Sequence, residues 1–265
     1  MRTAVADIPV LEPFPWRALV DYFSHRLIPQ LERVEPERFF RRVGRREITV
    51  EFDAPRSRLI VTADGRVKSA DIVTRVSQLF AVDHDAKILP AALSEDAALG
   101  PRIAAVPGMR PLGTWSAFEL CARTVIGQQV TVAAAGTLMR RLVERCGEVT
   151  PACVLSADLS NMGMPGRRVE TIRGLARAVL DERVDFDLPW KSVEGALKTL
   201  PGFGPWTRAY LAIRLGREPD AFPETDLGLI RAAGAASPAD LLKRAEAWRP
   251  WRAYAATYLW AVKPA

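Results

Sequence analysis

The feature that most constrains this chain is a glycine-containing turn between two apolar, helix-forming segments. The turn is Leu200–Gly204 (LPGFG), and Pro205 follows it at the first position of the next predicted helix. Glycine tolerates a positive φ and lets another molecule approach the backbone, and proline suits the first helical position because its missing N–H is not needed there. The sequence therefore predicts a tight helix–turn–helix with amide donors at Gly202, Gly204 and the start of the second helix.

This turn has two interpretations that its sequence leaves open. Amides at a helix start carry a partial positive charge and bind phosphate oxygens, and the hydroxyl of Thr207 adds a further donor. Glycine turns also join packed helices in many proteins without binding anything. The net charge of +6 and the pI of about 9.5 suit a polyanionic partner, although charge alone does not establish one.

A single acidic residue, Asp226, closes the loop that follows the second helix. Pro223 ends any helix before it, so Asp226 stands at the start of the next predicted helix. An aspartate at that position is usually a cap, and Asp220, Glu224 and Asp240 are alternative acidic candidates. The second interpretation is that Asp226 is a catalytic carboxylate.

The helix after the turn presents aromatic side chains on one face. Trp206 and Tyr210 are four residues apart and therefore share that face, and Trp260 closes the last apolar helix. Such residues belong to the core in most helices. Near a carboxylate they also form a cleft in which a flat, electron-poor ring stacks.

The chain changes character along its length, from mixed α/β to helical. Strands are predicted at 46–52 and 58–63, flanked by helices at 16–28 and 67–80. Residues 84–113 are interrupted by proline and glycine. We therefore expect an α+β protein, with a mixed α/β domain at 1–88 and an all-helical domain at 89–265.

The helical part contains recognisable starts and breaks. Ser116-x-x-Glu119 is a capping box that opens one helix, and Gly127–Gln129 separates it from a helix at 130–145. Ser237-Pro238 is a further helix start. Other helices are expected at 167–180, 193–199 and 251–260.

Several classes of protein are disfavoured by what the sequence lacks. No apolar run approaches the ~18 residues of a membrane span, and the first residues lack the apolar core of a signal peptide. Cys121, Cys146 and Cys153 form no C-x-x-C pair, which disfavours a disulfide framework, a zinc site or an iron–sulfur cluster. We therefore expect a cytoplasmic protein.

Taken in order, the motifs resemble one known superfamily, the helix–hairpin–helix DNA glycosylases, and within it the bacterial DNA-3-methyladenine glycosylase II family. The resemblance spans nearly the whole chain, and its first part is similar to the small TATA-binding-protein-like domain of that family. The segments that carry it are Phe118-Glu119 through Ile126-Gly127-Gln128, Gly163-Met164-Pro165, Phe203-Gly204-Pro205-Trp206-Thr207 and Arg249-Pro250-Trp251-Arg252.

The resemblance implies a role for each matching residue. It makes Asp226 the catalytic aspartate, and it assigns DNA binding to the turn and to the loop at 127–130. It implies no required cofactor, but a monovalent cation, Na⁺ or K⁺, held by backbone carbonyls of the turn. The base pocket would comprise Trp206, Tyr210, Trp260 and Tyr22; the DNA contacts Gly202, Gly204, Thr207, Gln128 and Gln129; and the cation ligands Lys198, Leu200 and Phe203.

Two departures from the family pattern bear on the activity. Strand-cleaving relatives have a nucleophilic lysine where this chain has Trp206, and without that amine no Schiff base with the sugar forms. The methyladenine enzymes have an apolar leucine where this chain has Gln129, in the element that wedges into the duplex. The sequence thus predicts a base-releasing enzyme without lyase activity, and a polar wedge.

The expected function is hydrolysis of the N-glycosidic bond of alkylated purines, such as 3-methyladenine and 7-methylguanine, in double-stranded DNA. Methylation at N3 or N7 makes the base a cation that leaves as a neutral molecule, so no general acid is needed. Both histidines, His25 and His84, lie in the first domain. The alternatives are a non-catalytic DNA-binding module, a glycosylase for oxidised or deaminated bases, and a sequence-specific regulator, which the scattered arginines disfavour.

Overall fold

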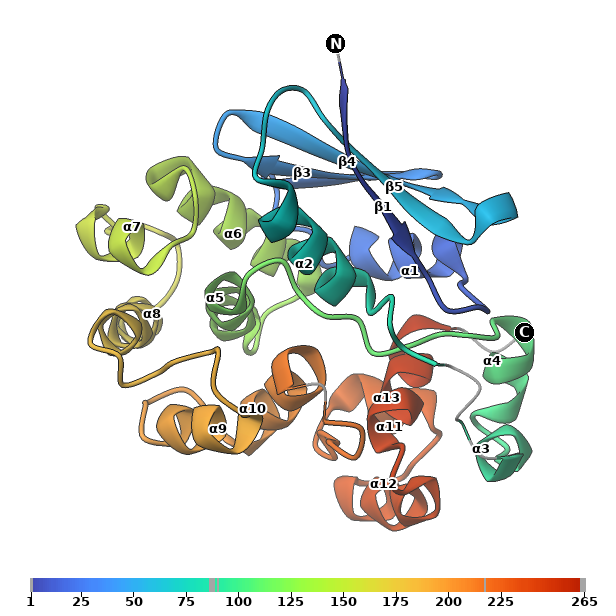
Figure 1. The fold of residues 1–265 in the computed structure, drawn as a ribbon. Coiled ribbons are helices and arrows are strands. Elements are labelled where there is room, and N and C mark those ends of the chain that lie inside the picture. The colour runs from blue at the N-terminus through green and yellow to red at the C-terminus, as the bar shows by residue number, and fades with distance from the viewer. Residues whose placement is uncertain (1, 86–88, 90, 217, 263–265) are drawn as a thin grey trace.

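The computed structural model describes residues 2–85, 89, 91–216 and 218–262. A β-sheet lies at one end of the molecule and helices form the rest (Figure 1). The fold is α+β, as predicted from the sequence. In the described residues, none of the helices is long and apolar enough to cross a membrane.

The sheet has five antiparallel strands in the order β1-β5-β4-β3-β2. Helices α1 and α2 pack against one of its faces (Figure 1). Central residues pair in register, for example Val50 with Val61. The strands are β1 (Thr3–Pro9), β2 (Glu32–Glu35), β3 (Arg38–Val43), β4 (Arg46–Asp53) and β5 (Arg58–Ala63), and the helices are α1 (Trp16–Ser24) and α2 (Ser69–Phe80).

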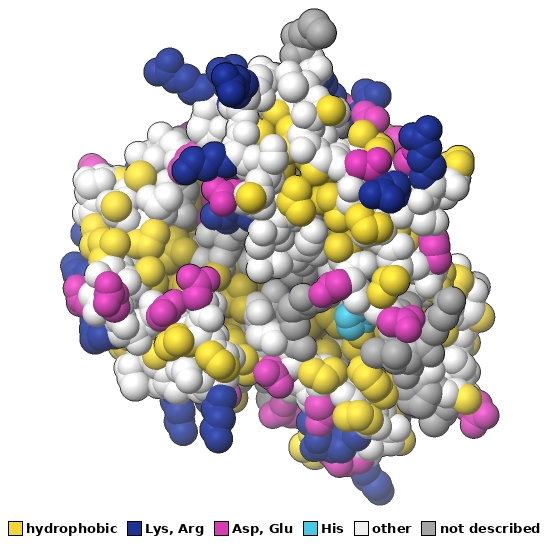
Figure 2. All heavy atoms as spheres, in the orientation of Figure 1, with side chains coloured by type: hydrophobic (Ala, Val, Ile, Leu, Met, Phe, Trp, Pro, Cys, Tyr) yellow, Lys and Arg dark blue, Asp and Glu magenta, His cyan; other side chains and the backbone are white. Residues whose placement is uncertain are grey.

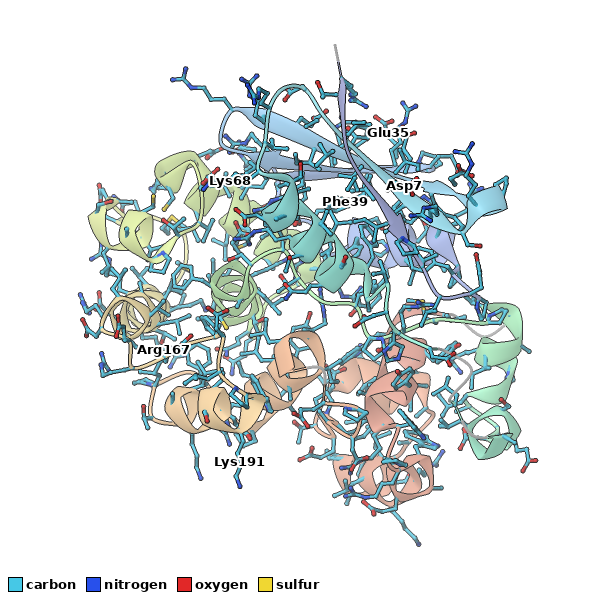
Figure 3. The ribbon with its side chains drawn as sticks, in the orientation of Figure 1. Asp7, Glu35, Phe39, Lys68, Arg167 and Lys191 are labelled. Atoms are coloured by element: carbon cyan, nitrogen blue, oxygen red, sulfur yellow. The ribbon has the colours of Figure 1, made fainter. Side chains whose placement is uncertain are left out.

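The sequence predicted β4 and β5 but missed the other three strands. β1 and β2 are edge strands that carry charged residues, Asp7 in β1 and Glu32, Arg33 and Glu35 in β2, as edges commonly do to avoid pairing with other chains. In β3, arginines obscure the apolar alternation, yet Phe39 is fully buried. Figure 3 shows Phe39 between the sheet and the helices below it. Pairing with β4, rather than local pattern, makes this segment a strand.

The remaining chain is helical, and the predicted helices are confirmed to within a few residues at their ends. The short helices α3, α4 and α7 were not predicted. The bounds are α3 (Ala91–Glu95), α4 (Gly100–Ala105), α5 (Ala117–Gly127), α6 (Val132–Cys146), α7 (Pro151–Ser156), α8 (Gly166–Leu180), α9 (Trp190–Lys198), α10 (Pro205–Leu211) with a π-helical extension (Ala212–Gly216), α11 (Leu227–Ala232), α12 (Pro238–Ala245) and α13 (Arg252–Ala261).

Two hydrophobic cores organise these elements. One joins the sheet, α1 and α2 to α11, α12 and α13 from the other end of the chain, and the second lies among α5 to α10. Trp260 packs against both cores. The proposed boundary between residues 88 and 89 adjoins residues 86–88, which lie outside the described residues, and it stays a prediction.

A buried ion pair ties the sheet to the helical region. Arg41 of β3 donates to Glu119 Oε1 of α5 at 2.6 Å and to Glu32 Oε1 at 3.0 Å. The predicted cap at Ser116 is present, since its Oγ accepts the Glu119 amide at 3.4 Å. The Glu119 carboxylate pairs with Arg41 instead of completing the box. Burial raises the pKa of this carboxyl, and Arg41 opposes that shift.

Candidate active site

Asp226 is a helix cap in this structure. Its Oδ1 accepts the Leu229 amide at 2.9 Å, which fixes the carboxylate at the first turn of α11. The capping interpretation of the sequence is therefore confirmed. It does not exclude a chemical role, because a cap holds the side chain in one orientation and leaves the other oxygen for a second partner.

Two indole N–H groups complete the surroundings of this carboxylate. Trp206 Nε1 donates to Oδ2 at 2.9 Å and Trp260 Nε1 donates to Oδ1 at 3.2 Å. Among the described residues, Oδ1 thus accepts two hydrogen bonds and Oδ2 accepts one, which leaves one acceptor direction on Oδ2. Asp226 is half-buried. Donors from α10, α11 and α13 together hold its charge in place.

The rings of the predicted pocket stand beside this carboxylate. Trp206 and Tyr210 stack with centroids 5.7 Å apart at 6°, and Tyr210 meets Trp260 edge to face at 5.6 Å. Tyr210 is buried, whereas both tryptophans keep part of their surface in solvent. The structure thus brings together three of the four predicted pocket residues at Asp226, with aromatic surface open to a ligand.

Tyr22 reaches this cluster through an arginine. The guanidinium carbon of Arg214 lies 5.7 Å from the ring centroid of Tyr22 and 5.9 Å from that of Tyr210. Tyr22 is buried, and Arg26 lies 3.8 Å above its ring in a cation–π contact. A base that stacked on this face of Tyr22 would displace Arg26.

Three arginines near Tyr210 were not anticipated from the sequence. Arg214 Nη1 donates to the Tyr210 hydroxyl at 2.9 Å. Burial raises the pKa of that hydroxyl, but Arg214, Arg26 and Arg123 outweigh it and lower the pKa below its usual value. Arg214 follows Tyr210 by four residues, a spacing that places both on one helix face and could have indicated the contact.

Gly228 is a further site residue that the sequence did not single out. A Cβ atom at this position would lie 2.9 Å from Asp226 Oδ1 and 3.8 Å from Trp260 Cδ1. A methyl group at this position would therefore press on the carboxylate, whereas 3.8 Å is an ordinary contact distance to the indole ring. The absence of a side chain at Gly228 leaves room for the Asp226 carboxylate in its observed position.

The glycine turn has the predicted form. Gly202 has a φ of +86°, and Gly204 is the N-cap of α10 with Pro205 in its first turn. Both glycines are exposed. Thr207 is buried, and its hydroxyl accepts a hydrogen bond from Gln128 Nε2 at 3.0 Å rather than facing solvent.

Gln128 links the turn to the α5–α6 loop. Its Nε2 also donates to the Gly202 carbonyl at 2.8 Å, and the backbone carbonyl of Gln128 accepts from Arg168 Nη2 of α8 at 2.7 Å. The neighbouring Gln129 is exposed and has a φ of +57° at the tip of the loop. The two predicted DNA-contacting elements are thus joined by one side chain. Direct contact of these residues with DNA stays a prediction.

The proposed cation ligands do not fit a monovalent cation well. The Phe203 carbonyl already accepts from Arg208 Nη1 at 2.6 Å, and that of Leu200 lies 3.5 Å from the Phe203 amide. A cation on the same Phe203 oxygen would lie about 4 Å from the guanidinium and be repelled by about 4 kcal/mol at an effective dielectric constant of about 20. We therefore derive no step that involves Na⁺ or K⁺, and we treat the expected cation at Lys198, Leu200 and Phe203 as incompatible with this arrangement.

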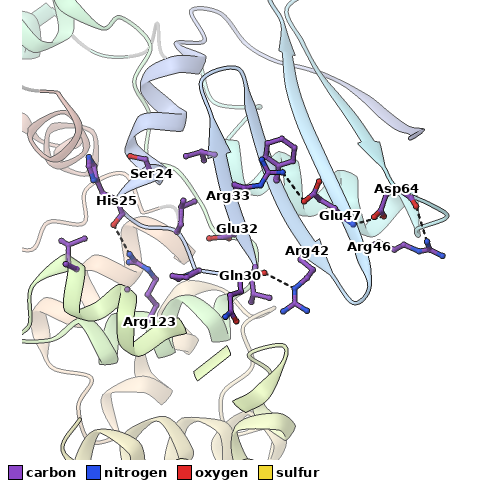
Figure 4. Close-up of a pocket in the computed structure, with 18 of the residues that line it drawn as sticks. Ser24, His25, Gln30, Glu32, Arg33, Arg42, Arg46, Glu47, Asp64 and Arg123 are labelled. Carbon is purple, nitrogen blue, oxygen red and sulfur yellow. Dashed lines mark hydrogen bonds and ion pairs between the residues drawn. The ribbon is translucent and has the colours of Figure 1, made fainter. Parts of the chain in front are cut away.

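A large cavity lies away from Asp226. It has a volume of about 980 Å³ and lies between strands β2 to β4 and the start of α6 (Figure 4). Most of its charged side chains have partners; for example, Arg33 pairs with Glu47, and Arg123 Nη2 donates to the His25 carbonyl. On the face shown in Figure 2, acidic and basic side chains are interspersed. Neither feature indicates a ligand.

Comparison with known proteins identifies the family of this chain. Residues 5–116 match the AlkA N-terminal domain, and residues 122–247 match the family described as HhH-GPD superfamily base excision DNA repair protein. DNA-3-methyladenine glycosylase 2 of Escherichia coli is 30% identical over 271 residues, which cover 94% of each chain. The chain belongs to the HhH-GPD superfamily. Its AlkA-type domain arrangement confirms the resemblance seen in the sequence.

Solved structures share the same fold as this HhH-GPD protein. The 3-methyladenine DNA glycosylase of Archaeoglobus fulgidus superposes with a TM-score of 0.77 at 20% identity, over 98% of this chain and 97% of that one. The 3-methyladenine DNA glycosylase of Schizosaccharomyces pombe, solved in complex with abasic DNA, gives 0.57 at 23% identity over 64% of this chain and 93% of that one. At these identities the likeness establishes the fold alone.

Proposed function

We propose that this protein is a DNA-3-methyladenine glycosylase of base excision repair. It would release alkylated purines, 3-methyladenine and 7-methylguanine among them, from double-stranded DNA and leave an abasic site. The observation that carries the proposal is the Asp226 carboxylate, held by two indole N–H groups and walled by the rings of Trp206, Tyr210 and Trp260.

Two chemical roles are open to Asp226: it either stabilises the positive charge that develops on the sugar or orients the attacking water. Its hydrogen bonds favour the first role. The C1′–N bond breaks with its electron pair going to the base, so positive charge develops on the sugar. Water then adds to C1′ and loses a proton to the solvent. Three N–H donors already hold its two oxygens, which fixes the carboxylate in one orientation and leaves one acceptor direction on Oδ2. We therefore assign it electrostatic stabilisation of the oxocarbenium-like sugar through the open direction on Oδ2.

The leaving base needs little help from the protein. A purine methylated at N3 or N7 departs as a neutral molecule, and the aromatic walls favour its cationic ring by roughly 0.5–2 kcal/mol per contact. Extrusion of the base from the helix costs a few kcal/mol and is easier for damaged pairs. The site therefore needs a carboxylate and stacking surface rather than a general acid.

Strand cleavage is not part of the proposed activity. Trp206 occupies the position of the nucleophilic lysine in bifunctional relatives, and its Nε1–H is committed to Asp226. An indole cannot form a Schiff base with the sugar. Borohydride treatment on abasic DNA should give no covalent adduct, and a clear adduct would show that another amine acts as a lyase nucleophile.

One observation supports a second candidate, a glycosylase for neutral damaged bases such as deaminated purines. The guanidinium groups of Arg214 and Arg26 lie against the rings of Tyr210 and Tyr22. Positive charge beside the pocket opposes a cationic base and offers hydrogen-bond donors to a neutral one.

A substrate panel decides between the two candidates. Radiolabelled bases released from methylated DNA are identified by chromatography, and release from duplexes containing hypoxanthine is measured in parallel. The main proposal predicts faster release of 3-methyladenine and 7-methylguanine. Faster release of hypoxanthine would favour the second candidate, and release of neither would leave a non-catalytic DNA-binding module.

The DNA partner, oligomeric state and cellular location are proposed from the similarity to known glycosylases. A relative was solved with abasic DNA, and we propose duplex DNA as the partner of this chain. We further propose that it acts as a monomer, on one lesion at a time, in the cytoplasm at the nucleoid. No cofactor is needed for the proposed reaction.

A further inference from the structure

The glycine turn has an arginine side chain folded against it. Arg208, in α10, donates from Nη1 to the Phe203 carbonyl at 2.6 Å and from Nε to Glu194 Oε1 of α9 at 3.4 Å. Only 16% of its side chain is exposed. One guanidinium therefore connects the helix before the turn, the turn itself and the helix after it.

We infer that the Arg208 guanidinium takes the place of the monovalent cation expected at this turn, so that the turn grips a DNA phosphate without Na⁺ or K⁺. The inference rests on the proposed function, because it concerns how the same protein holds its DNA. It assigns to Arg208 the positive charge beside Gly202 and Gly204 that an ion would otherwise supply.

The carbonyl groups of the turn support this substitution. The Phe203 carbonyl accepts from Arg208 and the Gly202 carbonyl accepts from Gln128 Nε2 at 2.8 Å. Side-chain donors of the protein thus reach the carbonyl of Phe203, which is one of the three expected cation ligands, and that of its neighbour Gly202. Carbonyls that need an ion to neutralise them would be left without such donors.

The chemistry of guanidinium suits this position. Arginine stays charged at all physiological pH values and presents several N–H groups in a fixed plane, which match phosphate oxygens. Within the described residues Nη2 of Arg208 makes no hydrogen bond, so it remains for a ligand. Glu194 is 45% exposed and its contact with Arg208 is long, so this ion pair withdraws little of the charge.

The test is cation dependence of DNA binding. The full chain is titrated with a duplex that carries a tetrahydrofuran abasic-site analogue, in KCl, NaCl or tetramethylammonium chloride at equal ionic strength. Tetramethylammonium is too large to sit among carbonyl groups. The Kd values of the wild type in the three salts should agree within about two-fold. A Kd that is about ten-fold higher in tetramethylammonium alone would overturn the inference.

The variant Arg208→Ala gives the converse result. Because the guanidinium is removed, the Kd in tetramethylammonium should rise about ten-fold, and K⁺ or Na⁺ should restore part of the lost DNA affinity. The Kd of Arg208→Lys should lie between those of the wild type and Arg208→Ala. Arg183→Ala, which removes an exposed arginine, should bind DNA as the wild type does. If Arg208→Ala binds as tightly as wild type in all three salts, Arg208 does not have this role.

These outcomes are separate from those of the proposed function. The wild-type comparison needs no variant to fold, and thermal unfolding of Arg208→Ala reports whether the altered turn is still folded. A protein that binds the duplex without cation dependence yet releases no base would refute the glycosylase proposal and leave the inference about Arg208 intact.

Discussion

The Asp226 site and the glycine turn share helix α10 but are built in different ways. The turn is made by neighbours in sequence, since Gly202, Gly204 and Arg208 lie within seven residues of one another. The donors to Asp226, in contrast, come from Trp206 and Trp260, which are 20 and 34 residues away. The turn is a local structure, and the candidate active site exists only when α10, α11 and α13 are packed.

Adjacent residues of α10 serve these two regions separately. Trp206 donates to Asp226, and Thr207, the next residue, accepts from Gln128. Positions one apart point in different directions on a helix. Changes on the Asp226 side should therefore alter the rate of base release, and changes on the Gln128 side should alter DNA affinity.

The largest expected effect is at the carboxylate. Asp226→Asn keeps the cap and the shape but removes the charge, so single-turnover release of 3-methyladenine should fall on the order of 10³-fold with little change in Kd. Asp240→Asn is a matched control, because Asp240 also accepts a backbone amide at a helix start. Wild-type release by Asp226→Asn would contradict the catalytic assignment.

The next effect is at the indole donors. Trp206→Phe retains an aromatic ring but removes the 2.9 Å hydrogen bond to Oδ2, and a bond to a charged group contributes about 1.5–3 kcal/mol, or roughly ten- to hundred-fold in rate. Trp260→Phe should cost less, since its bond is longer and Oδ1 keeps the Leu229 amide.

The control for the indole variants is a tryptophan elsewhere that makes the same interaction. Trp248 Nε1 donates to Asp96 Oδ2 at 2.9 Å. Trp248→Phe should lower the melting temperature without lowering the rate of base release in the folded protein. If Trp248→Phe slows base release as much as Trp206→Phe does, the indole bonds act through stability and not through Asp226.

A smaller change in rate is expected from Gly228→Ala. The new methyl group would push against Asp226 Oδ1, and a shift of the reacting group should slow base release about ten-fold while leaving DNA affinity unchanged. Single-turnover kinetics and binding titrations measure the two quantities. Gly174→Ala, in open space on α8, is the control. An unchanged rate in Gly228→Ala would mean that the carboxylate position is not critical.

The smallest effect belongs to the grip on DNA. Gln128→Ala removes the hydrogen bonds to the Gly202 carbonyl and to the Thr207 hydroxyl. The turn and the α5–α6 loop should therefore lose their fixed relative position. We expect a roughly five-fold higher Kd and an unchanged single-turnover rate at saturating protein. Gln78→Ala, exposed on α2, should match wild type in both. A slower rate in Gln128→Ala with unchanged Kd would remove the distinction between the two regions.

The sequence alone predicted the features that depend on near neighbours. The turn at Leu200–Gly204, the Ser116 cap and the start of the helix at Pro238 follow from residues within about four positions of each other, and each is present. The cap at Asp226 followed from its place at a helix start after a proline, whereas its catalytic role came from the family resemblance and stays a prediction. These features are local because φ preferences and capping hydrogen bonds act over one turn of chain.

The tertiary structure decided which groups meet across the chain. The sequence did not predict four contacts, those of Trp260 with Asp226, Arg214 with Tyr210, Arg26 with Tyr22 and Arg41 with Glu119. Strands β1 to β3 likewise formed only by pairing with their neighbours. No periodicity reports which side chain of one helix faces another. The sequence by itself therefore determined the turn, the caps and the identity of the carboxylate, whereas the packing of α10, α11 and α13 determined how that carboxylate is held.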